Sequence, residues 1–186
     1  MEKIFNLDIK KVLLETNIKR GVDKYADIMQ TFFLSNVSTN RDFQRKFNGF
    51  YRVRRNTDWQ NIYYDIMERG KTGELNFENI LRELYIKTGR VEASFASKLL
   101  HTLNNNMPIW DRYVLQNLGL KMPICNGEKK FEIAVYLYYK IVDWYDKALS
   151  TIEIQQKTVE FDETFPEYKW FSKTKKLDFL LWQIRD

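Results

Sequence analysis

The stretch that decides the fold of this chain runs from Gly89 to Leu118 and reads GRVEASFASKLLHTLNNNMPIWDRYVLQNL. Its apolar residues recur at helical spacing between 91 and 104, and Pro108 bars a helix from continuing through the connector that follows. Asp111 then stands directly before a second apolar run, where aspartate is a favoured N-cap. The stretch therefore predicts two helices joined by a short polar connector.

The rest of the chain repeats this helical pattern. Glycine (7) and proline (3) are scarce, and no strand-like alternation exceeds four residues. We therefore expect an all-α fold: one domain over 1–186 with about nine or ten helices, in which about 76–118 form a helix-hairpin-helix-like module. Gly89 stands where a left-handed C-terminal cap belongs. Helices are expected over residues 8–17, 22–35 and 41–55, and the longest helix over 127–155. Three more helices are expected to begin at N-caps: Thr57, with Gln60 completing a capping box, Asn76 and Ser172. Residues 157–171 are expected to be irregular.

The composition excludes several classes of protein. Hydrophobic residues make up 44% and charged residues 30%, which is typical of a globular chain. The one cysteine, Cys125, and the one histidine, His101, exclude disulfide frameworks within the chain, iron–sulfur clusters and His-rich or Cys-rich metal sites. We expect no metal and no cofactor. The N-terminus carries charges every few residues and no 18-residue apolar run exists, so we expect no signal peptide, no membrane partner and a cytoplasmic location.

The positive charge is concentrated in one short segment. Residues 41–55 carry a net charge of +5, which equals the net charge of the whole chain. Arg41, Arg45, Arg52 and Arg55 fall opposite the aromatic residues of this expected helix. Arginine suits bidentate contact with phosphate, so the segment favours a polyanion such as DNA as partner. A solvated helix face is the alternative.

The expected helix over 91–104 has a polar side. Ser94, Ser97, Lys98 and His101 lie three or four residues apart and are therefore neighbours on one face. They form either a partly exposed flank with a structural histidine or the lining of a cleft.

The order of helix, glycine-containing hairpin, helix, connector and aspartate resembles the helix-hairpin-helix DNA glycosylase superfamily, which includes 8-oxoguanine glycosylase-like and endonuclease III-like enzymes. The residues concerned are the hairpin Lys87–Val91, the helix 92–104 and Asp111 in Pro-Ile-Trp-Asp, about 35 residues in all. The segments ASKLLH and PIWD also resemble a group of uncharacterised bacterial proteins that carry this module.

The resemblance implies a role in DNA repair, with chemistry at Asp111. That carboxylate would stabilise the cationic sugar while the glycosidic bond of a flipped-out base breaks. Trp110 would stack against the base, with Tyr113 and Phe95 as the other aromatic candidates. As an N-cap, Asp111 can fill both roles, because a helix N-terminus stabilises the anionic carboxylate.

The resemblance also implies a DNA-binding hairpin, although two positions depart from the family pattern. Amides around Gly89 would contact phosphate and Arg90 would add positive charge. Val91 replaces the usual second glycine, and Ala93 stands where bifunctional members carry their Schiff-base lysine. Lys98, five residues later, is the candidate nucleophile in this chain.

Three functions therefore remain open. The first is a DNA glycosylase-like enzyme that acts through Asp111, with or without Lys98. The second is a nucleic-acid-binding module without catalysis. The third is a helical protein-interaction module that uses the aromatic residues between 161 and 171.

Overall fold

The computed structural model describes residues 2–184, apart from the side chains of residues 2, 3 and 16, and confirms the all-α class. Within this range the chain contains helices and no strand. The helices are α1 (Glu2–Phe5), α2 (Ile9–Leu13), α3 (Thr16–Leu34), α4 (Arg41–Tyr51), α5 (Thr57–Gly70), α6 (Phe77–Thr88), α7 (Ala93–Leu103), α8 (Arg112–Asn117), α9 (Gly127–Leu149), α10 (Ile152–Thr164), the 3-10 turn η1 (Pro166–Tyr168) and α11 (Lys173–Leu181).

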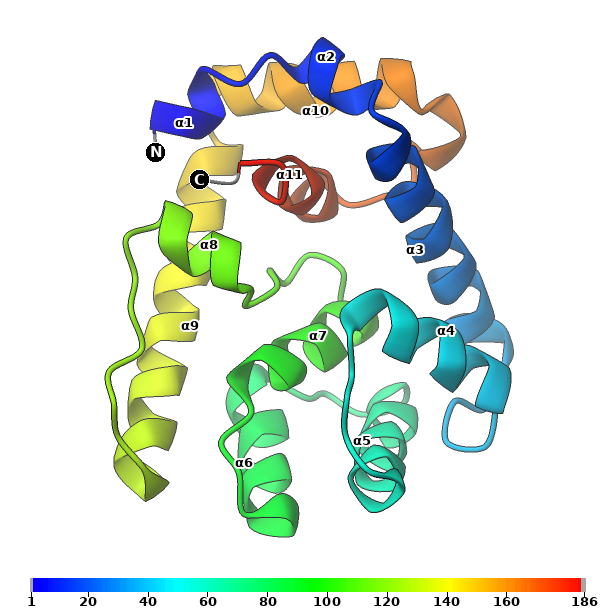
Figure 1. The fold of residues 1–186 in the computed structure, drawn as a ribbon, viewed down its shortest axis with the longest axis vertical. Helices are drawn as coiled ribbons and strands as arrows, with labels where there is room; N and C mark the ends of the chain where they lie inside the picture. Colours follow the sequence, from blue (N-terminus) through cyan, green and yellow to red (C-terminus); the bar gives the residue numbers. More distant parts are fainter. Residues whose placement is uncertain (1, 185–186) are drawn as a thin grey trace.

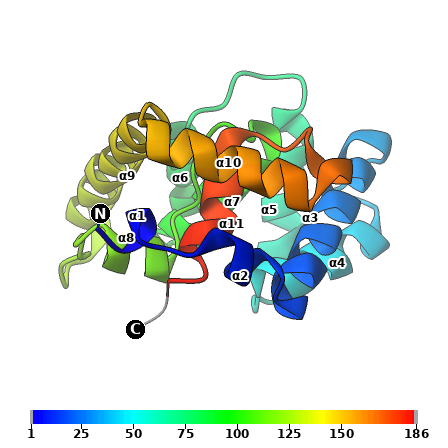
Figure 2. The same ribbon diagram turned by 90° about the horizontal axis from the view of Figure 1, so that it is seen from above.

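The helices form a ring around a buried central helix. Figure 1 shows α9 and α3 on opposite sides, with α10 and α2 across one end and α5 and α6 at the other. Helix α10 packs against α2, α9 and α11, and α6 packs against α5, α7 and α9. Figure 2 shows α11 beneath α10, inside the ring.

Helix α11 is the centre of the fold. Its residues from Thr174 to Leu181 are all buried. Three of them are charged, Lys175, Lys176 and Asp178. Lys175 and Asp178 form an ion pair of 2.7 Å with side chains 0% and 1% exposed. A charge this deeply buried requires such a partner, because desolvation otherwise drives it to the neutral state.

Helices α6 and α7 pack against each other across the predicted hairpin. Asn76 caps α6 through its side chain, which accepts from the N–H of Asn79. Gly89 ends α6 in the left-handed region at φ 69°, and its N–H donates to the Tyr85 carbonyl at 2.8 Å. Both caps were predicted, and both are confirmed.

The predicted basic helix is shorter than expected. It ends at Tyr51 instead of Arg55, because Arg52 adopts the left-handed conformation at φ 55°. The predicted Thr57 cap is wrong as well. Asn56 is the N-cap of α5 and accepts from the N–H of Trp59, while the Gln60 side chain donates to the Arg55 carbonyl. Asparagine is a stronger cap than threonine, which shifts the start by one residue.

Three further expectations about helix boundaries are wrong. The longest helix ends at Leu149, and Thr151 caps a separate helix, α10, because serine and threonine favour caps over helix interiors. Residues 157–164, expected to be irregular, belong to α10. At the other end, α3 starts at Thr16, six residues before the expected position.

None of the helices within residues 2–184 combines the length and the apolar character that crossing a membrane requires.

Candidate functional site

A pocket of about 290 Å³ contains both residues for which the sequence predicted catalysis, Lys98 and Asp111. Four segments that are distant in sequence build it: the end of α4, the middle of α7, the start of α8 and the chain after α11. We call it the Lys98–Asp111 pocket. Its lining consists of Lys98, Asp111, Arg52 and the aromatic residues Phe50, Tyr51, Phe95, Tyr113 and Trp182.

Helix α7 holds Lys98 against aromatic rings. The residue is 8% exposed, and its Nζ donates to the Oγ of Ser94 at 3.0 Å. Nζ also lies 5.1 Å from the ring centre of Phe95 and 5.9 Å from that of Tyr51, within the range of cation–π attraction. These contacts fix the amine at the pocket wall.

The pKa of Lys98 is lowered from its ordinary value. Burial is the main cause, because it penalises the ammonium form, and the positive charge of Arg52 acts in the same direction. Asp111 and Asp178 oppose the shift. A lowered pKa increases the fraction of neutral amine, the form in which lysine acts as a nucleophile.

Asp111 lies where the connector enters α8 and is the N-cap of that helix, as predicted. Its Oδ1 accepts from the N–H of Tyr113 at 2.8 Å. The backbone of Asp111 is extended, at φ −125° and ψ 157°. Neighbouring side chains on extended backbone point to opposite sides.

Trp110 accordingly lies on the other side of the connector from the pocket. Its side chain is 7% exposed and faces a separate surface groove lined by Arg112, Leu120 and Met122, among others. The structure therefore does not bring Trp110 together with Lys98 and Asp111. Tyr113 and Phe95, the other aromatic candidates, do line the Lys98–Asp111 pocket.

Side chains from several helices hold the connector before Asp111 in place. The N–H of Trp110 donates to Ser97 Oγ at 2.8 Å, and the hydroxyl of Tyr138 donates to the Pro108 carbonyl at 3.0 Å. His101 Nδ1 lies 2.7 Å from the carbonyl oxygen of Met107. Since a carbonyl only accepts, Nδ1 carries the proton. Ser172 and Thr174, at the start of α11, donate to the carbonyls of Asn105 and Asn106. Side chains from α7, α9 and α11 thus satisfy the polar connector.

His101 has a structural role. It is fully buried, and with Nδ1 protonated its Nε2 accepts from the hydroxyl of Tyr25 at 3.0 Å. Burial, reinforced by the charge of Lys175, lowers the pKa of His101 to about 3. The polar side of α7 is therefore divided: Lys98 lines the pocket, whereas Ser97 and His101 anchor the connector.

The buried ion pair of α11 lies directly behind the pocket. Lys175 Nζ is 5.8 Å from the ring centre of Phe50 and 5.6 Å from that of Trp182, two rings that line the pocket. Burial lowers the pKa of Lys175 and raises that of Asp178, and the charge of each partner opposes the shift of the other. The hydroxyl of Tyr51 is buried and has no hydrogen-bond partner within residues 2–184.

The predicted DNA-binding arginines of α4 are divided between its two ends. Arg52 lines the Lys98–Asp111 pocket. Arg41 donates to Gln44 Oε1 at 2.7 Å and Arg45 pairs with Asp42, both in the first turn of the helix. At 1.5 Å per residue, Arg41 and Arg52 are separated by about 16 Å of helix. They do not form one continuous basic face.

Arg55, Gly89 and Arg90 do meet at the hairpin. They line a common pocket of about 450 Å³ with Lys130. Arg55 forms an ion pair with Glu92, and the guanidinium of Arg55 lies 2.7 Å from Glu92 Oε1. These three predicted residues form a second group, apart from Arg41 and Arg45.

Sequence reasoning missed several residues of the sites. Phe50 and Tyr51 had been assigned to the core of α4, and Trp182 follows α11, far along the chain from the predicted module. No spacing pattern links residue 182 to residue 98. The one available signal was the polar side of α7, which left open whether it lined a cleft or formed a partly exposed flank.

The segment proposed for protein interaction is mostly core. Phe161, Phe165 and Phe171 are at most 4% exposed, whereas Trp170 is 45% exposed. The aromatic residues of 161–171 therefore serve mainly to pack α10 against α11.

Within the part of the chain that the structure describes, no three His, Cys, Asp or Glu side chains gather as metal ligands would. No protein-family model, no curated protein and no solved structure matches the chain.

Proposed function

We propose that this chain binds DNA and releases a base from it, with the target nucleotide turned out of the stack into the Lys98–Asp111 pocket. One observation carries the proposal: Lys98 and Asp111 line a single pocket whose other walls are mainly aromatic. A volume of about 290 Å³ lies at the lower end of the roughly 300–1,000 Å³ of small-molecule sites. Aromatic walls suit a planar base, since stacking contributes about 1–3 kcal/mol per base.

The two polar residues have complementary roles. The neutral amine of Lys98 attacks C1′ of the sugar, the C1′–N bond breaks, and the base leaves with the bonding electrons and a proton from solvent. The carboxylate of Asp111 stabilises the positive charge that develops on the sugar. The C1′–O4′ bond then breaks, O4′ keeps the bonding electrons and takes up a proton, and the nitrogen of Lys98 loses its two protons, which leaves an imine between Lys98 and C1′. If water attacks in place of the amine, Asp111 acts in the same way and no imine forms.

Base release and borohydride trapping together test the proposal. Duplexes that carry single damaged bases, and a duplex with an abasic site, are incubated with the protein. We expect release of a damaged base, a loss of about 10²–10³-fold in rate for Asp111→Asn, and a trapped covalent complex that disappears in Lys98→Ala. Lys147→Ala is the matched control, because its ammonium pairs with Asp143 on a side chain that is 74% exposed.

The outcomes separate the three functions. Absence of both base release and trapping on every duplex would overturn the catalytic proposal. Salt-dependent DNA binding that persists without turnover would then indicate a binding module. Absence of a gel shift even at low salt would favour a protein-interaction module.

A further inference from the structure

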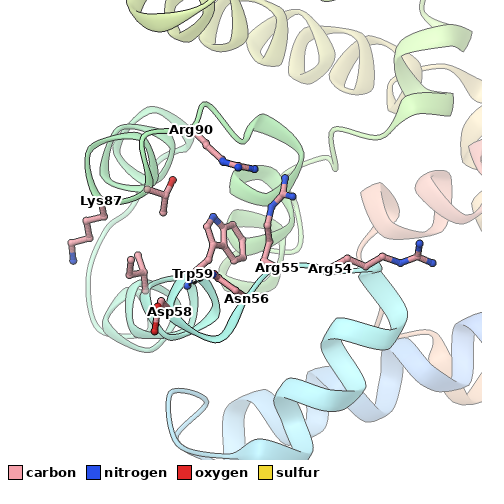
Figure 3. Close-up of a pocket in the computed structure, with 9 residues that line it drawn as sticks. Arg54, Arg55, Asn56, Asp58, Trp59, Lys87 and Arg90 are labelled. Atoms are coloured by element: carbon pink, nitrogen blue, oxygen red, sulfur yellow. Dashed lines mark hydrogen bonds between the residues drawn. The ribbon is translucent and has the colours of Figure 1, made fainter.

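A second pocket, of about 490 Å³, lies between the start of α5 and the end of α6 and is lined by basic side chains. Figure 3 shows this pocket: Arg54 and Arg55 come from the turn before α5, Lys87 from the last turn of α6, and Arg90 from the segment after α6. The Trp59 indole lies between the two groups (Figure 3). We call it the Trp59 pocket.

Two buried hydrogen-bond donors in this pocket have no partner among the residues that the structure describes. They are Trp59 Nε1 and Arg55 Nε. Trp59 is 6% exposed, and its ring is fixed by stacking on Tyr63 at 4.9 Å and by an edge contact with Phe95 at 5.0 Å. An unsatisfied buried donor costs about 1–3 kcal/mol, so two of them on one wall indicate an acceptor that binds there.

The charges around these donors define that acceptor. Arg54 and Arg90 are exposed and form no ion pair within residues 2–184. Arg55 forms an ion pair with Glu92, and Lys87 forms one with Glu83. Figure 3 shows the guanidinium groups of Arg55 and Arg90 on one side of the indole and the carboxylate of Asp58 on the other. Guanidinium groups and an indole N–H can only donate hydrogen bonds, so the ligand must be an anion with several acceptor oxygens.

We propose that the Trp59 pocket binds a phosphomonoester, with its phosphate oxygens on Trp59 Nε1, Arg55 Nε and the guanidinium of Arg90. A phosphomonoester carries about −1.5 to −2 charges and three acceptor oxygens, which suits the unpaired guanidinium of Arg90 beside two unsatisfied donors. Arg54 extends away from the indole (Figure 3) and adds positive charge at the edge of the pocket. The volume leaves room for the sugar attached to the phosphate. The source is either the terminal phosphate of a DNA strand or a free nucleotide. The inference does not require base excision.

The test follows the indole N–H resonance of Trp59, which Trp59→Phe identifies. Inorganic phosphate, a nucleoside monophosphate, and one oligonucleotide with either a 5′-phosphate or a 5′-hydroxyl are titrated into the full chain. We expect the resonance to shift on phosphate binding. At least tenfold tighter binding of the 5′-phosphorylated oligonucleotide supports a strand terminus as the source. If the two oligonucleotides bind equally well and the nucleoside monophosphate also binds, the result supports a free nucleotide as the source of the phosphate.

Two variants and a control make the test specific. Arg54→Ala combined with Arg90→Ala should weaken phosphate binding at least tenfold without loss of the folded state, since both side chains are exposed. Trp59→Phe keeps an aromatic ring but removes the indole resonance, so its phosphate affinity is measured by calorimetry and should be several-fold weaker. Arg45→Ala removes the same charge from a side chain that is 80% exposed and should change nothing. An unshifted indole resonance with all four probes overturns the proposal, whatever the result of base-release assays with Lys98 and Asp111 variants.

Discussion

Ser97 Oγ accepts the backbone N–H of Trp110 at 2.8 Å, and this contact docks the connector onto α7 one residue before Asp111. The same hydroxyl donates to the Ser94 carbonyl at 3.0 Å. Ser97 is fully buried and directly precedes Lys98. One hydroxyl thus couples the position of Asp111 to the helix that carries Lys98.

Ser97→Ala should destabilise the protein and lower activity more than the stability loss explains. The variant leaves the N–H of Trp110 buried without an acceptor, which costs about 1–3 kcal/mol. Urea denaturation measures that loss, and the rate of base release or trapping is compared under conditions where both proteins are folded. Ser150→Ala, at an exposed position, is the control. Full activity in Ser97→Ala would contradict a positioning role.

Arg52→Gly should increase stability and weaken DNA binding. Arg52 adopts φ 55°, which costs a non-glycine residue about 1 kcal/mol, and glycine removes that cost. The substitution also removes a guanidinium from the mouth of the Lys98–Asp111 pocket. Arg52→Ala separates the two effects, because it loses the charge and keeps the unfavourable backbone. Urea midpoints and gel shifts at two salt concentrations measure both, and a less stable Arg52→Gly would contradict the backbone argument.

Removing one partner of the Lys175–Asp178 pair should lower the free energy of unfolding strongly, whereas replacing both partners with apolar residues should lower it much less. Asp178→Asn leaves the Lys175 charge buried without a partner and should destabilise the fold by about 3–5 kcal/mol. Lys175→Met combined with Asp178→Leu fills similar volume without charge and should cost less than either single change. Asp143→Asn breaks an exposed pair of the same length and should cost less than about 1 kcal/mol. Thermal and urea unfolding of the four proteins checks the order.

Stability should fall in mild acid because of His101. Its pKa is about 3 in the folded protein, whereas an unfolded histidine titrates near 6.5. Between these values the unfolded chain binds a proton that the folded chain does not, so stability is lost as the pH falls through this window. The loss is at most about 1.4 kcal/mol per pH unit.

His101→Gln isolates this contribution, because glutamine does not titrate. Urea unfolding at pH 7 and pH 4.5 should show a smaller loss of stability for the variant than for the natural chain, whatever its stability at pH 7. Equal losses in the two proteins would show that the imidazole is not responsible.

The sequence predicted the local features of the site with good accuracy. The Gly89 cap, the Asn76 cap and the Asp111 cap each depend on a few neighbouring residues, so each can be recognised from the chain itself. The helix predictions that failed concern boundaries: the ends at Arg52 and Ser150 and the starts at Thr16 and Asn56. Several neighbouring residues compete to set such a boundary. Periodicity does not decide that competition, since the apolar stripe continues across the break.

Sequence by itself determined that this chain is all-helical and that Lys98 and Asp111 stand on either side of a polar connector. Only the tertiary structure decided that both line one pocket, that Trp110 faces away from it, and that Trp182 completes its wall. The physical reason is the separation along the sequence over which each kind of interaction acts. Hydrogen bonds and helical periodicity act over a few residues, whereas a pocket is formed by side chains from segments that packing brings together around α11.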